Sequence, residues 1–354
     1  MRIAYVVPGL DPFGPILVVK SLVEIMQSMG HDVSVYYLKN RITEMRMPCR
    51  VHKVGTGSQI DFENYDIVHT HCFSADRYVG KLHANIHGWK WVSTIHQNTF
   101  EDLGFIYSRP LAYVLSRYWL SVQGKADAVV AITDYVKNVC QKYINAPLTT
   151  IYNGINVTQT AEDSDKREDI IKFIRKIKSQ KRIIVGTYAN IIKRKGIIQV
   201  FRCMVIDKSF DFVIIGDGKE KESLMKAADR LHLTNRVHFF SNVRAPYQCL
   251  SDMDIYIVPS YSEGFCLSLV EAASMGLPIV CSNIPPFHEL FDKNDVAFFE
   301  LDDAYSMSNA IHYALGNREL LSVMAFERSM LYGKDRMGCD YLKLYESLLS
   351  GTVG

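Results

Sequence analysis

The sequence lacks the cysteine spacing of a metal or redox motif, and it lacks long apolar runs. Its eight cysteines are scattered, and no two of them form a C-x-x-C pair. Such usage argues against a disulfide framework and a zinc site, and it favours a reducing cytoplasm. No stretch approaches about 18 uninterrupted apolar residues, and the apolar run at the N-terminus is too short for a signal peptide. We therefore expect a cytoplasmic protein whose only membrane contact is peripheral.

An excess of charge of one sign is missing as well. The chain has 40 Lys and Arg against 38 Asp and Glu, which leaves a formal net charge of +2. A nucleic-acid partner is therefore not expected. With 354 residues, of which 48% are hydrophobic and 22% charged, the chain is too long for one ordinary core and suits two folded domains.

Short apolar stretches alternate with helical patterns along the first part of the chain. Residues 3–7 form a continuous apolar run, a loop with Pro and Gly follows over 8–14, and a helical pattern leads to a second apolar run over 33–38. This order of strand, loop, helix and strand predicts a doubly wound α/β sheet. The loop lacks the G-x-G-x-x-G spacing of dinucleotide-dependent dehydrogenases, which disfavours that class.

The most informative stretch begins at Val258 and ends at Cys281. Its pattern predicts the end of a buried strand, a loop over 259–264, a helix to about residue 275 and another buried strand. Gly264 allows a ligand close to the backbone, and the N-terminus of the following helix attracts an anion. Two carboxylates flank this position. A nucleotide-sugar, with hydroxyls at both ends and phosphates between them, fits such a site.

The two carboxylates are Glu263, just before the helix, and Glu271, about 12 Å further along at about 1.5 Å of rise per residue. Two glutamates at this spacing can also be ordinary solvated side chains. Glu271, however, lies in an otherwise apolar helix, where burying an idle carboxylate would be costly. The pattern therefore favours a binding role for Glu271.

The same residues carry a resemblance to a known family. Glu263-Gly264-Phe265, then Glu271 and the run Ala-x-x-x-Gly-x-Pro, resemble the signature of the retaining family-4 (group 1) glycosyltransferases. The resemblance implies that Glu263 contacts the hydroxyls of the donor sugar and that Glu271 holds the ribose diol. It also implies that the amides of Gly264 and Phe265 contact the pyrophosphate or the sugar.

The resemblance extends to other loops. It implies donor-binding roles for further residues, namely Gly14, Asn190, Arg194, Gly216, Val243, Arg244, Cys266 and Leu267, and a catalytic role for Lys195. Two positions depart from the family pattern. Pro15 stands where a second Gly is common, and Asn190 stands where the family carries an Arg. Either Lys193 or Arg194 supplies the missing charge, or the leaving group is less strongly stabilised here.

Two histidines follow apolar strands. The strand over 66–71 ends in His71, and the strand over 90–95 leads to His96. Ligands of parallel α/β sheets bind beyond the carboxyl ends of strands, although histidines there are often only hydrogen-bonded core residues. The family carries a histidine at both positions. This implies a catalytic role for His96 near the donor sugar and leaves His71 open between acceptor binding and packing.

Two segments raise the question of a membrane. Residues 39–53 carry five basic residues against one acid, Glu44. They form either a solvated loop or a basic surface facing an anionic membrane or a pyrophosphate-linked acceptor. Residues 100–123 predict a long helical segment rich in aromatic residues, with core packing as the first interpretation and a membrane-facing edge as the second. Asp252-Met-Asp254 superficially resembles a metal motif, but it precedes a buried strand and is interpreted as structural.

The resemblance implies a GT-B fold, with two doubly wound Rossmann-like domains facing across a cleft. We expect an acceptor-binding domain over 1–160, a linker over 161–181, a nucleotide-sugar-binding domain over 182–334 and a final helix over 335–354 that crosses back. The implied function is retaining transfer of a hexose or N-acetylhexosamine, from a UDP-sugar by preference, to a saccharide acceptor. A lipid-linked acceptor in surface polysaccharide or O-antigen synthesis is favoured.

No metal and no cofactor are expected, because the nucleotide-sugar is a substrate. Two alternatives remain. A nucleotide-sugar 2-epimerase shares the architecture and the donor, although the glutamate pair disfavours it. A non-catalytic nucleotide-sugar-binding subunit is left open by Asn190.

Overall fold

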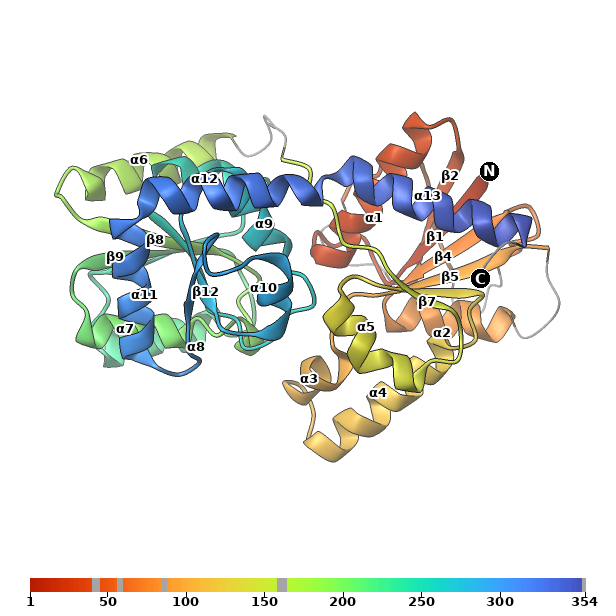
Figure 1. The fold of residues 1–354 in the computed structure, drawn as a ribbon, viewed down its shortest axis with the longest axis horizontal. Coiled ribbons are helices and arrows are strands. Elements are labelled where there is room, and N and C mark those ends of the chain that lie inside the picture. Colours follow the sequence, from red (N-terminus) through yellow and green to blue (C-terminus); the bar gives the residue numbers. More distant parts are fainter. Residues whose placement is uncertain (40–44, 56–59, 84–87, 158–163, 352–354) are drawn as a thin grey trace. The chain divides into compact units, whose positions relative to one another are not determined.

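The structure, a computed structural model, describes residues 1–39, 45–55, 60–83, 88–157 and 164–351. The chain divides into two compact units, one made of Met1–Ile155 with Tyr332–Gly354 and the other of Asn156–Leu331. Each unit contains one parallel sheet with helices (Figure 1). The predicted pair of doubly wound, Rossmann-like domains is therefore confirmed.

The first unit is built on a seven-stranded sheet in the order β3-β2-β1-β4-β5-β6-β7. All of its strand pairs are parallel. Its strands are β1 (Arg2–Val7), β2 (Asp32–Tyr37), β3 (Arg50–Lys53), β4 (Ile67–His71), β5 (Lys90–Ile95), β6 (Ala128–Ala131) and β7 (Leu148–Thr150). The central strands are buried along almost their whole length, which explains why they read as continuous apolar runs.

Helices cover both faces of this sheet. They are α1 (Gly14–Ser28), α2 (Phe73–Leu82), α3 (Thr99–Gly104), α4 (Arg109–Gln123), α5 (Asp134–Cys140) and α13 (Lys334–Ser350), with the short helix η1 (Gln141–Tyr143). α2 and α4 pack together over one core cluster that contains Trp91 and Leu120. α13 packs on α1, where Gly338 lies directly against Ile25. The final helix thus belongs to the first unit, although it follows the second unit in the chain.

The second unit is built on a six-stranded parallel sheet in the order β10-β9-β8-β11-β12-β13. The strands are β8 (Ile183–Tyr188), β9 (Phe210–Ile215), β10 (Val237–Phe240), β11 (Ile255–Val258), β12 (Ile279–Ser282) and β13 (Ala297–Phe299). The helices are α6 (Ser164–Lys178), α7 (Ile198–Ile206), α8 (Lys221–Arg230), α9 (Leu267–Ser274), α10 (Pro285–Leu290), α11 (Ala304–Gly316) and α12 (Arg318–Ser329). The short helices are η2 (Lys193–Lys195), η3 (Pro246–Asp252) and, at the junction of the units, η4 (Met330–Tyr332).

Most of the segment that we expected as a linker, 161–181, is a helix of the second unit. Residues 161–163 lie outside the described part, and the rest contains α6, which packs against β8 and η3 of the second unit. Arg175 pairs with Asp252 and Lys178 pairs with Asp254. The sequence of α6 is rich in charge, and only the fold shows that the partners of its basic side chains are acids of the second unit.

Two further features of the first unit differ from the sequence-based expectation. The helical segment over 100–123 is broken into α3 and α4, because Gly104 is the last residue of α3 and Pro110, which is tolerated only in the first turn of a helix, is the second residue of α4. Within the basic run 39–53, residues 50–53 form the edge strand β3, and Arg50 binds Asp32 at 2.6 and 2.8 Å. Residues 40–44, with Arg41 and Glu44, lie outside the described part of the chain.

Candidate functional site

The candidate site of the second unit lies where the strand order of its sheet reverses. β8 has β9 on one side and β11 on the other. Ligands of open parallel sheets bind beyond the carboxyl ends of the strands at such a point. The loops after β8 and β11, residues 189–197 and 259–266, carry several predicted residues, namely Asn190, Arg194, Lys195, Glu263, Gly264, Phe265 and Cys266.

Glu263 is the centre of a buried ionic cluster that joins these two loops. Its carboxylate accepts hydrogen bonds from Nζ of Lys195 at 2.6 Å, from Nη1 of Arg194 at 2.9 Å and from Oγ of Ser260 at 2.7 Å. The residue is only 5% exposed. Burial alone would raise the pKa of Glu263, but Lys195 and Arg194 outweigh it and lower the pKa to about 2. Glu263 is therefore an ionised carboxylate in a fixed orientation.

The two loops are also held together through their backbones. Gly196 has a φ of 62°, and a Cβ there would overlap the carbonyl oxygen of Pro259. The amide of Tyr261 donates to the carbonyl of Arg194 at 2.9 Å, and Nε2 of Gln199 donates to the carbonyl of Pro259 at 2.7 Å. Position 196 therefore requires glycine, both for its left-handed backbone and for the close approach of the neighbouring loop.

Glu271 lies on α9 and is bound by a residue that the sequence analysis missed. The hydroxyl of Tyr188, the last residue of β8, donates to Oε2 of Glu271 at 2.5 Å. Burial raises the pKa of Glu271, and this hydrogen bond opposes the rise. The hydroxyl of Tyr256 in turn donates to the carbonyl of Tyr188 at 3.2 Å. Tyr188 thus orients the carboxylate, and the only sequence signal for it was a tyrosine at the carboxyl end of a predicted strand.

The basic loop shows where the charges near Asn190 lie. Arg194 and Lys195 both bind Glu263, and Arg194 also donates to the carbonyl of Ser262 at 2.5 Å. The side chain of Lys193 is exposed. Asn190 is exposed too, and it lies against Gly218 in the turn after β9. Of the two candidates for the charge missing at Asn190, Arg194 is therefore the one that lies beside Glu263, and Lys193 does not.

The remaining predicted residues of the loop before α9 offer mainly their backbones. Phe265 is 1% exposed, so its side chain belongs to the core. Cys266 precedes the first residue of α9, Leu267, and has a φ of 71°, unusual for a residue other than glycine. Gly264 is buried between them and Glu263. The N–H groups at this helix start form a suitable seat for an anion.

Other predicted donor-binding residues lie on neighbouring loops. Gly216 directly follows β9 and lies against the loop after β8, because a Cβ at position 216 would overlap the carbonyl oxygen of Ala189. After β10, Val243 is buried, whereas Arg244 is exposed and accepts a hydrogen bond from Arg167 through its carbonyl at 3.1 Å. Gly14, by contrast, is the first residue of α1 and belongs to the first unit.

The Asp-x-Asp sequence at 252–254 is occupied by structural contacts. Asp252 binds Arg175, and Asp254 binds Lys178 and Arg318. Asp254 also accepts the amide of Ile184 at 2.8 Å, which fixes it at the start of β8. Over the described ranges, no group of three or more His, Cys, Asp and Glu side chains is arranged to hold a metal ion.

In the first unit, the two predicted histidines are in direct contact. Nδ1 of His71 lies 2.8 Å from Nε2 of His96, so one of these nitrogens donates to the other. His71 is fully buried at the end of β4, and His96, just after β5, is partly exposed. Burial lowers the pKa of His96 to about 3, and burial with the neighbouring imidazoles lowers the pKa of His71. Both rings are therefore neutral at physiological pH.

A hydrogen-bonded network behind this pair was not predicted. Nδ1 of His69 lies 2.7 Å from the hydroxyl of Tyr345, and Nε2 lies 2.8 Å from Oγ1 of Thr94. The hydroxyl of Tyr341 lies 3.0 Å from Thr94, and the ring of His69 lies 4.2 Å from that of His71. α13 is thus tied to the sheet immediately beside the histidine pair. The contact joins residues 276 positions apart, so no local pattern could have revealed it.

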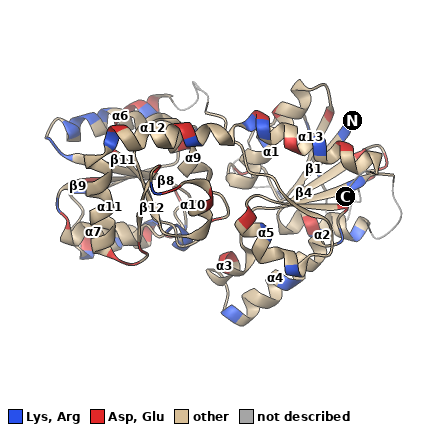
Figure 2. Cartoon of the chain, viewed as in Figure 1, with Lys and Arg blue, Asp and Glu red and all other residues tan. Residues whose placement is uncertain are grey.

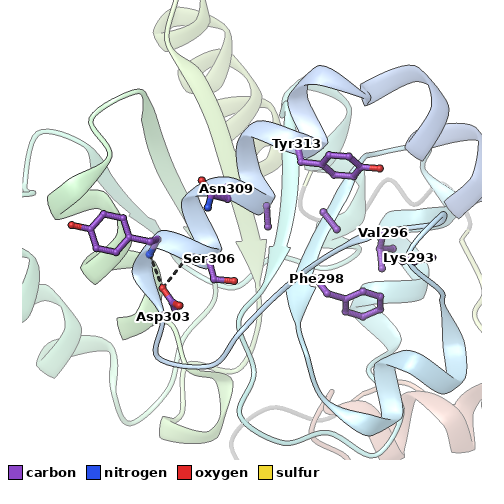
Figure 3. Close-up of a pocket in the computed structure, with 10 residues that line it drawn as sticks. Lys293, Val296, Phe298, Asp303, Ser306, Asn309 and Tyr313 are labelled. Atoms are coloured by element: carbon purple, nitrogen blue, oxygen red, sulfur yellow. Dashed lines mark hydrogen bonds between the residues drawn. The ribbon is translucent and has the colours of Figure 1, made fainter.

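A depression of about 620 Å³ lies elsewhere in the second unit, between β13 and α11 (Figure 3). Phe298 and Tyr313 contribute to its wall. Asp303 caps α11 by accepting the amides of Tyr305 and Ser306 at 2.9 Å. None of the predicted site residues lines this depression, and we assign it no function.

The comparisons with known proteins agree with this geometry. Residues 17–159 match the model described as Glycosyltransferase Family 4, and residues 168–326 match the model described as Glycosyl transferases group 1. The O-antigen biosynthesis glycosyltransferase WclY of Escherichia coli is 28% identical over 331 residues, which make up 91% of each chain.

Two other proteins are informative. The N,N'-diacetylbacillosaminyl-diphospho-undecaprenol α-1,3-N-acetylgalactosaminyltransferase of Campylobacter jejuni is 26% identical over 54% of this chain and 50% of its own length. The structure of Anabaena Alr3699/HepE in complex with UDP-glucose has a TM-score of 0.80 at 16% identity, covering 98% of this chain and 100% of that one. This structural likeness confirms the predicted fold.

Proposed function

This chain belongs to the glycosyltransferases, with a family 4 region before a group 1 region, and we propose that it transfers a hexose or N-acetylhexosamine from a nucleotide-diphosphate sugar to a hydroxyl of a saccharide acceptor. The donor we favour is a UDP-sugar, because the structurally similar HepE binds UDP-glucose. Transfer proceeds with retention at the anomeric carbon and without a metal.

The observation that carries this proposal is the pair of oriented carboxylates around the start of α9. Glu263 is held ionised by Lys195 and Arg194, and Glu271 is oriented by Tyr188. A carboxylate offers about four acceptor positions, more than the three hydrogen bonds described for Glu263 use. Glu263 is suited to accept from sugar hydroxyls and Glu271 from the ribose diol, with the diphosphate at the helix start between them.

Lys195 and Arg194 are the groups that we expect to stabilise the departing diphosphate. An ammonium has three N–H donors and a guanidinium has five, so both can bind Glu263 and still donate elsewhere. Such fixed donors need no reorganisation when charge develops on the leaving group. The leaving phosphate can then take the proton of the acceptor hydroxyl on the same face of the sugar. No protein nucleophile is required, and the role proposed for His96 is contact near the donor sugar.

For the acceptor, we propose a lipid-linked saccharide in surface polysaccharide or O-antigen synthesis. The names of the E. coli and C. jejuni relatives support this assignment, the second through its diphospho-undecaprenol substrate. Such an acceptor places the enzyme at the inner face of the cytoplasmic membrane through peripheral contact. Along the described parts of the chain, no helix is both long and apolar enough to cross a bilayer.

The test compares Glu263→Ala with Glu271→Ala in UDP binding and in release of UDP from UDP-glucose and UDP-N-acetylglucosamine. A hydrogen bond to a charged group is typically worth ~1.5–3 kcal/mol, so Glu271→Ala should weaken UDP binding roughly ten- to a hundredfold. Glu263→Ala should leave UDP binding nearly unchanged and lower turnover, because the hexose loses its orientation.

Glu222→Ala, on the exposed face of α8, is the matched control and should change neither quantity. All variants need melting curves first, because both site glutamates contribute to packing. Equal losses of UDP affinity in the two site variants would contradict the division of roles. UDP binding without turnover of any donor, with or without acceptor, would favour a non-catalytic subunit, and release of a 2-epimerised sugar would favour the epimerase.

A further inference from the structure

One helix of the first unit presents apolar side chains on two opposite faces. α4 buries Ala112, Trp119 and Leu120 against the core. On its other face and in the turn before it, Tyr107, Leu111, Val114 and Tyr118 are 44%, 46%, 61% and 46% exposed. Leu111, Val114 and Tyr118, spaced three and four residues apart, form one stripe along the helix, and Tyr107 lies in the turn before it. We call these four residues the α4 stripe.

All charged residues of α4 are basic. α4 contains no acidic residue, and Figure 2 shows no red on this helix. Its two arginines, Arg109 and Arg117, are exposed. The guanidinium of Arg117 lies 4.7 Å from the ring of Tyr143, and Nζ of Lys142 lies 5.1 Å from the same ring. Cations and exposed aromatic and aliphatic side chains therefore occur together on this surface.

Acids near this surface belong to the neighbouring helices α3 and α5. Glu101 accepts the hydroxyl of Tyr135 at 2.7 Å, and Asp102 accepts Nε2 of Gln97 at 2.7 Å. Asp134 accepts the hydroxyl of Thr150 at 2.5 Å. These carboxylates keep their charge, but they lie outside α4 and do not interrupt the α4 stripe itself.

A second exposed apolar surface differs in charge. On α12, Leu320 and Val323 are 59% and 54% exposed, but the exposed acids Glu319 and Glu327 lie on the same helix, and its two arginines, Arg318 and Arg328, pair with Asp254 and Asp295. Carboxylates are repelled by anionic lipids, so this surface does not suit such a membrane. α4 and α12 thus expose similar apolar side chains, but only α4 is free of acidic residues.

We propose that the α4 stripe is the surface by which this protein docks on an anionic lipid bilayer. Helices that lie in a membrane interface combine an apolar face with flanking Lys and Arg, and tyrosine is enriched at the level of the lipid headgroups. Leu111 and Val114 enter the interface, while Arg117, beside the stripe on the helix, meets the lipid phosphates. The proposal deepens the proposed function, on whose lipid-linked acceptor it rests.

The test is co-sedimentation of the full chain with vesicles of phosphatidylcholine alone and of phosphatidylcholine with an equal part of phosphatidylglycerol. The wild type should bind the anionic vesicles more strongly, and salt should weaken this binding. The double substitution Leu111→Glu with Val114→Glu should weaken it by about tenfold or more. The matched control Val323→Glu should bind like the wild type.

Trp119 is buried on the same helix, and Trp89 and Trp91 lie in the same unit, so tryptophan fluorescence reports whether the first unit remains folded in the double variant. Arg109→Gln with Arg117→Gln gives an independent second variant, which should bind less and show a smaller salt dependence. No binding by the wild type at low salt, equal binding to both vesicles, or equal loss in the Val323→Glu control would overturn the proposal. A lipid-independent dimer that the double substitution dissociates would also overturn it, because a second copy would then occupy the stripe.

UDP affinity, measured on the same samples, separates this proposal from the proposed function. The double variant should bind UDP like the wild type, because the stripe lies in the first unit and the candidate nucleotide site in the second. Vesicle binding with no UDP binding by the wild type would refute the proposed function alone. UDP binding with no vesicle binding would refute the docking surface alone.

Discussion

Replacing Glu263 with Gln keeps the shape of the side chain and removes its charge. In the wild type, this carboxylate lies within hydrogen-bonding distance of Lys195 and Arg194, whose side chains are only 17% and 15% exposed. The variant leaves two largely buried cations without their counter-charge. Removing one partner of a buried ion pair is destabilising by about 3–5 kcal/mol in other proteins. We therefore expect Glu263→Gln to lower the free energy of unfolding of the second unit.

The pKa of Glu263 provides an independent magnitude. Its pKa falls from the ordinary value of 4.5 to about 2. At about 1.4 kcal/mol for each pKa unit, this shift corresponds to about 3 kcal/mol of stabilisation by the ionised form. The residue is 5% exposed, so screening by solvent reduces this value little. The expected loss in Glu263→Gln at pH 7 is therefore about 3 kcal/mol.

The sign of the pH dependence follows from the lowered pKa. The stabilisation is fully present above the unfolded pKa of 4.5, and it is lost as the pH falls toward the folded pKa of about 2. The difference in unfolding free energy between wild type and Glu263→Gln should therefore stay constant from pH 7 to about 5.5. It should shrink by about 1 kcal/mol at pH 4, where the unfolded state begins to bind the proton more strongly.

The assay is urea unfolding followed by circular dichroism. Fluorescence is unsuitable, because all three tryptophans, Trp89, Trp91 and Trp119, lie in the first unit. Two units can unfold in separate transitions, and only the one assigned to the second unit should shift. Glu222→Gln is the control for loss of one exposed glutamate. A difference below about 1 kcal/mol at pH 7, or one that does not shrink on acidification, would refute the reasoning.

Three further predictions concern the site. Tyr188→Phe removes the hydroxyl that orients Glu271, so UDP should bind about three- to tenfold more weakly. The control Tyr313→Phe, at an exposed position on α11, should have no effect, and unchanged UDP affinity in Tyr188→Phe would show that Tyr188 does not contribute to UDP binding. Burial lowers the pKa values of His71 and His96, so the ring resonances of these residues in NMR spectra should not titrate between pH 8 and 5. A titration midpoint inside that range would show that the pair is hydrated. Transfer should be insensitive to EDTA, because Lys195 and Arg194 supply the positive charge at the site; loss of turnover that magnesium or manganese restores would contradict this.

The sequence alone determined the architecture and the central residues of the candidate site. Apolar runs such as residues 3–7 and 33–38 indicate buried strands, and their alternation with helices indicates parallel sheets. Glycine at 264 and glutamate at 263 and 271 stood out because their chemistry is unusual for the apolar stretch around them. These signals are local in the sequence, so they can be recognised without knowledge of the packing.

The tertiary structure decided which of these residues touch. Arg194 and Lys195 meet Glu263 across about 68 positions of sequence, and Tyr188 meets Glu271 across 83. Likewise, α6 is part of the second unit rather than a linker because the acids that bind its basic face lie 76 and 77 positions away. Only the closing of the parallel sheets brings such positions together, because the ends of neighbouring strands need not be neighbours in sequence. The exposed stripe on α4 has the same origin: its residues are apolar in the sequence, and only the packing of the opposite face shows that they are left at the surface.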